Sequence, residues 1–311
     1  MEVLLTPTFI TAFIAGTVTV AVPLLLVGLG EQISEKAGVL NLGLEGMMLV
    51  GAFCGFAVAY ATGSFAYGFL GGMAGGIAVA ATMGLLCVVL TLNQIVIGIA
   101  ITLAMQGATS LAHHVLYARD FPRLPRHPEF AVPVLSELPY VGASLFKQNV
   151  VVYIAVALVL ILGLVFRRTG LGLNLTAAGE KPAALDVAGV SVTATRLSAV
   201  LATGALAGLG GAYLAQVGAG LFVPFMTGGQ GFMGIVLAML ARSQPVWVLV
   251  GALVIGITTS LTTALQVAGF QVPTDVVQMI PFATIIVVLS LLGRHAGLPA
   301  ALGLPYHRGV R

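Results

Sequence analysis

Residues 9–29 read FITAFIAGTVTVAVPLLLVGL, an apolar run without a single charged side chain. About 20 such residues, wound as a helix, cross the hydrocarbon core of a bilayer. The residues before the run, Met1-Glu2-Val3, lack the basic character that opens a secretory signal, and the run is longer than a signal core. We therefore interpret residues 9–29 as an uncleaved membrane-spanning helix.

The composition of the whole chain agrees with this interpretation. Of its 311 residues, 59% are hydrophobic and 7% are charged, whereas about a quarter of the residues of a soluble domain are charged. So few polar groups could not cover the surface of a soluble fold, which excludes a soluble enzyme. The abundance of apolar side chains also excludes a disordered chain. The composition predicts an all-α polytopic membrane protein.

The same length rule predicts about nine spanning helices, with eight or ten as alternatives, in one transmembrane domain over residues 1–311. Two of these segments fit least well, because residues 38–60 open with polar side chains and residues 229–242 are short. The expected segments are residues 8–30, 38–60, 66–91, 94–117, 149–166, 196–217, 229–242, 245–267 and 276–292.

Two polar segments interrupt the apolar pattern. Residues 118–148 are rich in proline, which predicts a loop with room for a short surface helix. Residues 167–195 contain an alanine-rich stretch that Glu180 and Pro182 open and Gly189 closes. Acid and proline are favoured in a first helical turn and glycine after the last one, so we expect a short helix over residues 181–188, outside the lipid.

The basic residues predict the orientation in the membrane. With nine spans, nine of the 13 Lys and Arg residues fall on the side of residues 167–195 and four on the side of residues 118–148. The positive-inside rule places the richer side in the cytoplasm. We therefore expect an external N-terminus and a cytoplasmic C-terminus.

A weak internal repeat links two of the predicted spans. Residues 43–50, GLEGMMLV, resemble residues 228–235, GGQGFMGI, and each stretch opens a hydrophobic segment. Since the two segments are five spans apart, they would run in opposite directions, as in transporters built from inverted repeats. The alternative is chance similarity between two glycine-rich stretches.

Asn41 and Glu45 stand out in residues 31–46, EQISEKAGVLNLGLEG. Glu45 lies between apolar neighbours at the start of a hydrophobic helix, and Asn41 lies among glycines. This pattern indicates a broken helix, which a membrane tolerates only where the backbone lines a cavity or is buried in protein. The alternative is an ordinary helix start, with Glu45 beside the positive end of the helix dipole.

Other polar or aromatic side chains inside apolar runs are candidates for the substrate path. Uncharged amides can hydrogen-bond a neutral solute, and aromatic rings can stack on a sugar or base. Amides also join helices, and aromatic residues also form interfacial belts. The candidates besides Asn41 and Glu45 are Asn93, Gln94, Gln106, Phe222, Phe225 and Gln230.

The motifs of other function classes are missing. The sequence has no GxxxxGK[ST] phosphate loop and no HExxH, CxxC or GxSxG motif. Cys54 and Cys87 lie in apolar stretches, and the adjacent His113 and His114 would point about 100° apart on a helix, which is poor geometry for a shared metal. We expect no enzyme activity, no metal and no cofactor bound by this chain.

Two stretches resemble a known family. Residues 35–48, EKAGVLNLGLEGMM, resemble the signature of bacterial ABC-importer permeases for nucleosides and simple sugars, in the ribose/branched-chain amino-acid permease superfamily. Residues 178–191, AGEKPAALDVAGVS, resemble its cytoplasmic coupling segment, with Lys181 where the family commonly has asparagine. The likeness covers nearly the whole chain.

The resemblance implies a permease subunit of the bacterial inner membrane that lacks its own ATPase. It implies three partners, namely a second related permease, a cytoplasmic ATPase that binds ATP-Mg, and an external binding protein or lipoprotein. A short helix at residues 180–189 would dock on the ATPase with its alanine-rich face. The coupling residues would be Gly179, Glu180, Pro182, Ala183, Ala184, Asp186, Val187 and Gly189.

The resemblance also narrows the substrate. The variant Leu44-Glu45-Gly46 resembles the nucleoside branch of the superfamily, so we expect a purine nucleoside first and a simple sugar such as ribose second. A secondary transporter or channel working alone is the main rival class. The near absence of charge inside the spans disfavours proton coupling.

Overall fold

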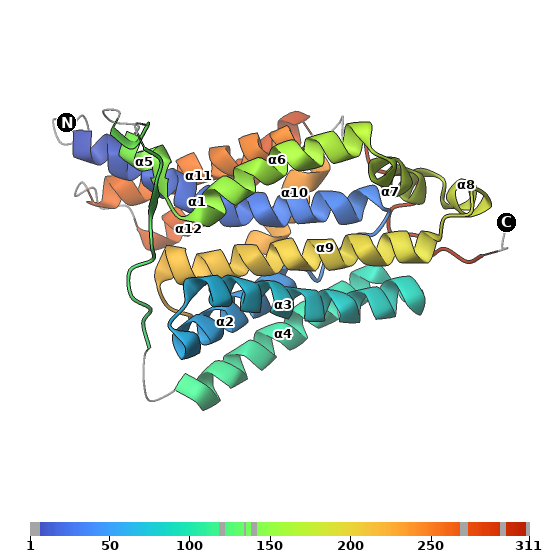
Figure 1. Cartoon of the computed structure of the whole chain (residues 1–311), viewed down its shortest axis with the longest axis horizontal. Coiled ribbons are helices and arrows are strands. Elements are labelled where there is room, and N and C mark those ends of the chain that lie inside the picture. Colours follow the sequence, from blue (N-terminus) through green and yellow to red (C-terminus); the bar gives the residue numbers. More distant parts are fainter. Residues whose placement is uncertain are drawn as a thin grey trace.

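A computed structural model describes residues 7–117, 122–133, 135–137, 142–267, 273–292 and 297–308. In these residues twelve α-helices form one elongated bundle (Figure 1). The helices are α1 (Pro7–Lys36), α2 (Leu44–Thr62), α3 (Phe65–Gly84), α4 (Gln94–Tyr117), α5 (Gly142–Phe146), α6 (Val150–Arg168), α7 (Gly170–Glu180), α8 (Pro182–Val187), α9 (Val192–Tyr213), α10 (Gln230–Leu240), α11 (Pro245–Val267) and α12 (Thr274–Leu292).

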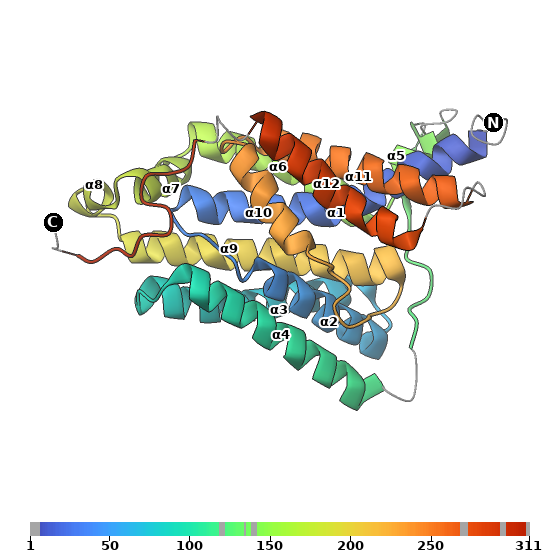
Figure 2. The ribbon, with the colours of Figure 1, turned by 180° about the vertical axis from the view of Figure 1, so that it is seen from behind.

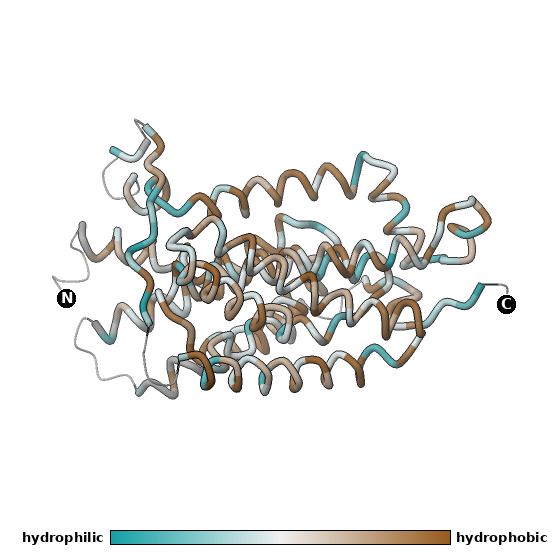
Figure 3. The backbone as a smooth tube through the Cα atoms, turned by 60° about the horizontal axis from the view of Figure 1, so that its bottom comes forward, coloured by the Kyte–Doolittle hydropathy of each residue, from teal (hydrophilic) through white to brown (hydrophobic). Residues whose placement is uncertain are grey.

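Each of the nine predicted apolar segments contains a helix, which confirms the all-α polytopic fold, although the segment predicted over residues 38–60 becomes helical only at Leu44. Six stretches among the described residues are long and apolar enough to span a membrane: Phe9–Lys36, Leu44–Thr62, Phe65–Val89, Gln94–Tyr117, Val150–Arg168 and Val192–Ala219. Three shorter apolar helices follow: Gln230–Leu240, Pro245–Leu261 and Met279–Val288. Most residues along the bundle are hydrophobic, and hydrophilic residues gather toward the two ends of the bundle (Figure 3).

The two predicted polar segments lie at opposite ends of the bundle (Figure 1). One end, which we call the α5 end, carries the start of α1 and the described parts of residues 122–148. There β1 (Phe130–Ala131) pairs with β2 (Lys147–Gln148) as an antiparallel hairpin, a 3-10 turn forms at Leu135–Glu137, and α5 is the short helix. The other end, the α8 end, carries α7, α8 and the C-terminal segment, residues 297–308.

Helix α1 occupies the centre and packs against α9, α10 and α11. On the other side of α9, the helices α2, α3 and α9 form a tight trio, and α4 lies outside against α2 (Figures 1 and 2). Glycines make the trio tight: a Cβ added to Gly208 would lie 3.0 Å from the carbonyl carbon of Gly72 and 3.1 Å from the Cα of Gly76. These glycines therefore bring the backbones of the helices into direct contact.

The chain repeats one structural unit in opposite directions. Helix α1 runs toward the α8 end, residues 37–43 return without helical structure, and α2 then runs toward the α5 end (Figure 2). Helix α9 with its π-helical extension Leu214–Ala219 runs toward the α5 end, residues 220–229 return, and α10 runs back (Figure 2). We call residues 37–43 the first link and residues 220–229 the second link. This arrangement agrees with the predicted broken helix and inverted repeat.

Candidate functional site

Glu45 connects the two helices that follow the links, α2 and α10. It is buried in the first turn of α2, where it is only 2% exposed. Its carboxylate accepts hydrogen bonds from the Thr227 hydroxyl at 2.5 Å, the Gly229 amide at 2.9 Å and the Gly231 amide at 2.6 Å. These three donors lie at the end of the second link and the start of α10, so Glu45 caps α10 from across the bundle.

The chemistry of helix ends explains this contact. The first amides of a helix have no partner inside the helix, and the aligned peptide dipoles make that end positive. The Glu45 carboxylate belongs to the first turn of α2 and accepts hydrogen bonds from the amides at the start of α10. Gly231 permits the approach, because an added Cβ would lie 2.5 Å from the Cα of Glu45. The predicted counterpart of Glu45 in the repeat, Gln230, carries no charge. The contact between α2 and α10 therefore contains one carboxylate rather than two.

Polar side chains support the first link. The Leu40 amide donates to Gln94 Oε1 at 2.8 Å, and the Asn41 amide donates to Glu31 Oε1 at 3.2 Å. The Thr102 hydroxyl donates to the Leu42 carbonyl at 3.0 Å. Non-helical backbone at membrane depth needs such partners. Gln94, expected on the substrate path, therefore has a contact that holds the broken segment in place.

The structure separates the other path candidates. Asn41 is fully buried, and its side-chain nitrogen Nδ2 donates to Met47 Sδ at 3.4 Å. Asn93 is exposed and caps α4, since its Oδ1 accepts from the amides of Ile95 and Val96. Gln106 is half-buried on α4. Gln230 starts α10, and its Oε1 has no hydrogen-bond partner among the residues that the structure describes.

Phe222 and Phe225, both in the second link, differ from each other. Phe222 is buried and belongs to a group of six rings, whereas Phe225 is 55% exposed and has a positive φ of 63°. Neighbouring ring centroids in the group lie between 5.2 Å (Phe53 and Phe222) and 6.1 Å (Phe56 and Tyr60) apart. The group comprises Phe53, Phe56, Tyr60, His113, Tyr117 and Phe222. We call it the aromatic group.

A cavity of about 300 Å³ adjoins the aromatic group. His113 and Phe222 line it together with Arg123, and the remaining lining is aliphatic. The lining of this cavity combines two rings with polar groups, as a site for a small polar solute does. Sequence reasoning did not single out His113 or Tyr117 as path residues, because their partners outside α4 lie far away along the chain: Phe222 for His113, and Phe56 and Tyr60 for Tyr117.

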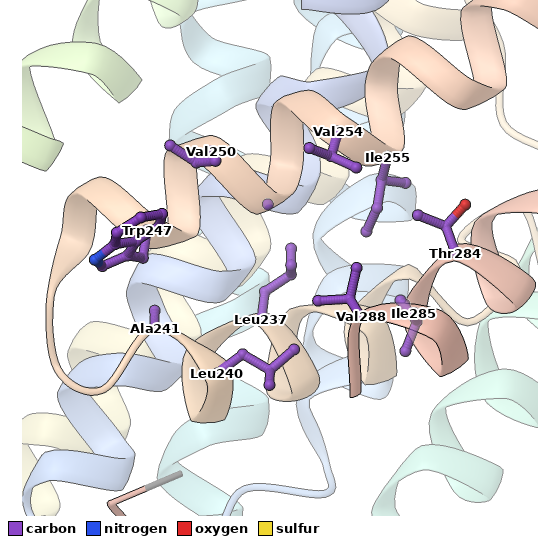
Figure 4. A pocket seen from close by; sticks show the side chains of 11 residues that line it. Leu237, Leu240, Ala241, Trp247, Val250, Val254, Ile255, Thr284, Ile285 and Val288 are labelled. Atoms are coloured by element: carbon purple, nitrogen blue, oxygen red, sulfur yellow. The ribbon is translucent and has the colours of Figure 1, made fainter. Parts of the chain in front are cut away.

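A second cavity differs in character. It measures about 170 Å³, lies between α10, α11 and α12, and is lined by side chains such as Leu237, Val254 and Ile285 (Figure 4). Its one hydroxyl side chain, Thr284, already donates to the Ile280 carbonyl at 2.8 Å. Apart from Trp247 and Thr284, this lining is aliphatic and offers a polar substrate few partners.

The predicted coupling segment forms a small helical hairpin at the α8 end. Leu185 is buried against Ala178 and Val192 and thereby anchors α8. The opposite face is exposed, with Val187 at 89%. Also exposed are Ala183, Ala184 and Ala188. Asp186 is partly buried and forms an ion pair with Arg308 at 3.2 Å. The exposed apolar face of α8 is therefore held in place by the buried contacts of Leu185 and the ion pair of Asp186.

Comparison with known proteins identifies the family. A family described as the permease component of branched-chain amino acid transport systems matches residues 13–289. The chain belongs to this permease family. No solved structure matches the permease.

Three relatives of the permease are ABC transporter permease proteins. TsgC13 of Haloferax volcanii, provisionally named for glucose, is 39% identical over 81% of this chain and 77% of its own. The nucleoside permease protein NupC of Lactococcus lactis is 30% identical over 94% of this chain and 96% of its own. The guanosine permease protein NupQ of Bacillus subtilis is 29% identical over 97% of this chain and 98% of its own. The chain is therefore an ABC transporter permease subunit that crosses the membrane several times.

Proposed function

We propose that the permease translocates a nucleoside, with purine nucleosides favoured, as part of an importer. The aromatic group and its cavity carry this proposal. A nucleoside presents a flat base and a hydroxylated ribose, and the cavity lining contains the Phe222 ring beside His113 and Arg123. Base–aromatic stacking contributes about 1–3 kcal/mol per base. The nucleoside-named relatives support the proposal because they align with nearly the full chain.

A simple sugar is the second candidate. The relative provisionally named for glucose has the higher identity, although it covers less of the chain. Sugars also stack on aromatic rings through their C–H faces. Uptake of radiolabelled guanosine, adenosine, uridine and glucose by cells that express the permease with its genomic neighbours separates the candidates. Guanosine or adenosine uptake supports the proposal, and uptake of glucose alone contradicts it.

We expect replacement of Phe222 by leucine to raise KM for the nucleoside about 10-fold, because it keeps the apolar volume and removes one stacking face. Phe225→Leu is the matched control, since Phe225 is exposed and belongs to no ring pair in the described part of the chain. KM for nucleoside uptake is the measurement. An equal KM for Phe222→Leu and wild type would remove the aromatic group from the substrate path.

The partner set follows from the permease role. In our proposal a separate cytoplasmic subunit binds and hydrolyses ATP-Mg, this chain binds no cofactor, and α8 docks on the ATPase. A second related permease completes the pore as a heterodimer, and an external binding protein or lipoprotein delivers the substrate. ATP-driven closure of the ATPase then switches the bundle between outward-facing and inward-facing states. Purification of the native assembly and identification of its subunits tests each partner.

We also propose that the α8 end is cytoplasmic and the α5 end external, in the inner membrane of a bacterium. The split of basic residues supports this orientation. Single cysteines at Pro128 and Ala183, both exposed, in a chain that lacks Cys54 and Cys87, test it. An impermeant thiol reagent added to intact cells should label position 128 and spare position 183. The reverse pattern would invert the orientation.

A further inference from the structure

Arg196, near the start of α9, holds three separate segments at the α8 end. It is 3% exposed, and its guanidinium donates to the carbonyls of Ala37 at 3.1 Å, Ala178 at 3.1 Å and Leu304 at 2.8 Å. Ala37 follows the last residue of α1, Ala178 lies in the last turn of α7, and Leu304 belongs to the C-terminal segment. No ion pair of the described residues includes Arg196.

The peptide groups around Arg196 explain a buried cation without a carboxylate. The last carbonyls of a helix lack partners, and that end carries negative partial charge, so cations are favoured there. Ala178 shows the cause directly. The residue four positions later is Pro182, which has no N–H to donate back. Arg196 supplies the missing donor and does the same for the end of α1.

The C-terminal segment also contacts the other two segments that Arg196 holds. We call this contact region around Arg196 the junction. The Ala301 amide donates to the Gly179 carbonyl at 2.8 Å, and the Gly303 amide donates to the Gly38 carbonyl at 3.1 Å. Gly38 has a φ of +85°, and an added Cβ there would lie 2.9 Å from a guanidinium nitrogen of Arg196. The segment therefore straps the α7–α8 hairpin to the beginning of the first link.

This junction is one end of a short covalent path to Glu45. The first link leaves the junction at Gly38 and ends where α2 begins at Leu44, one residue before Glu45. Between these points, Gln94 and Thr102 hold its backbone. A displacement of the α7–α8 hairpin that is transmitted through Arg196 would thus reach the contact between Glu45 and α10.

We propose that Arg196 is a positioning residue for energy coupling, which makes α8, the C-terminal segment and the start of the first link move as one body. The inference rests on the proposed docking of an ATPase at α8. It predicts that loosening the junction separates ATP hydrolysis from transport without removing either the docking face or the substrate path.

The test uses the assembled importer in proteoliposomes. Arg196→Lys keeps the positive charge, but an ammonium cannot span three carbonyls in the fork geometry of a guanidinium. A stop codon after Pro299 removes the hydrogen bonds of Ala301 and Gly303, together with Arg308, the ion-pair partner of Asp186, and retains every described helix. Arg168→Lys, at the exposed arginine that ends α6, is the matched control. We expect both test variants to lower substrate transported per ATP hydrolysed about 10-fold, with hydrolysis retained.

Hydrogen exchange of the same complexes supplies a readout that does not depend on transport. In Arg196→Lys the amides of Ala301 and Gly303 should exchange about 10-fold faster than in wild type, because their segment loses its anchor. Wild-type transport per ATP in both test variants, or unchanged exchange in Arg196→Lys, would overturn the inference. Wild-type transport by Ala184→Arg would instead overturn docking at α8, so the two failures are distinguishable.

Discussion

Replacement of Glu45 by alanine is expected to abolish transport. The substitution leaves the amides of Gly229 and Gly231 and the hydroxyl of Thr227 without their acceptor. A buried donor without a partner costs about 1–3 kcal/mol, so the three together disfavour the paired arrangement of α2 and α10 by about 3 kcal/mol or more. That energy corresponds to about 100-fold in population. Substrate uptake in proteoliposomes and the Tm of the purified permease are the measurements, and both should fall.

Two milder variants identify what Glu45 contributes. Glu45→Gln keeps the shape and one acceptor but removes the charge, and we expect about a 10-fold loss of uptake. Thr227→Val keeps the carboxylate and both of its backbone donors, so it should lose less than Glu45→Gln. Normal uptake and an unchanged Tm in Glu45→Ala would show that the carboxylate is only an interfacial helix start.

The second large effect concerns the exposed face of α8, for which we propose docking on the ATPase. Ala184→Arg should abolish transport-linked ATP hydrolysis, because a bulky charge cannot enter a groove that fits small apolar side chains and would be buried there unpaired. The permease itself should fold normally, since Ala184 is exposed and Leu185 anchors the helix from the other side. Binding-protein-stimulated ATP hydrolysis is the measurement, at matched levels of membrane expression.

Ala194→Arg is the matched control for this variant. It makes the same change at another exposed alanine at the α8 end, in the first turn of α9, and should leave hydrolysis close to wild type. An Ala184→Arg complex that takes up substrate normally would mean that α8 is a solvated loop element with no role in docking.

The fold was predictable from the sequence to the extent that a bilayer imposes it. Each apolar segment needs a fixed minimum length, and backbone groups in lipid must bond within their own helix, so length and composition locate the helices. The break at residues 37–43 was also predictable, because Asn41 and the adjacent glycines interrupt an otherwise apolar run. Pro182 and Gly189 similarly indicated the bounds of the short helix α8.

The partners of the polar residues were not predictable in the same way. Thr227 lies 182 residues from Glu45, and Ala37 lies 159 residues from Arg196. Nothing in their local sequence distinguishes these residues from others like them. Asn93 is a different case, because an asparagine immediately before an apolar helical run is a common N-cap. That local signal favoured the capping contact seen in the structure over a place on the substrate path.

The glycine contacts of α2, α3 and α9 decide which parts of the permease can rearrange during a transport cycle. Helices that touch backbone to backbone have no flexible side chains between them to absorb a shift, so the trio serves as a stationary frame. Helix α4 contacts this frame mainly through α2, α10 contacts it mainly through α2, and α12 packs on α10 and α11, so these three helices are the natural moving parts. Spin labels on α3 and α9 should therefore keep one distance throughout ATP turnover, whereas a pair on α9 and α10 should report two.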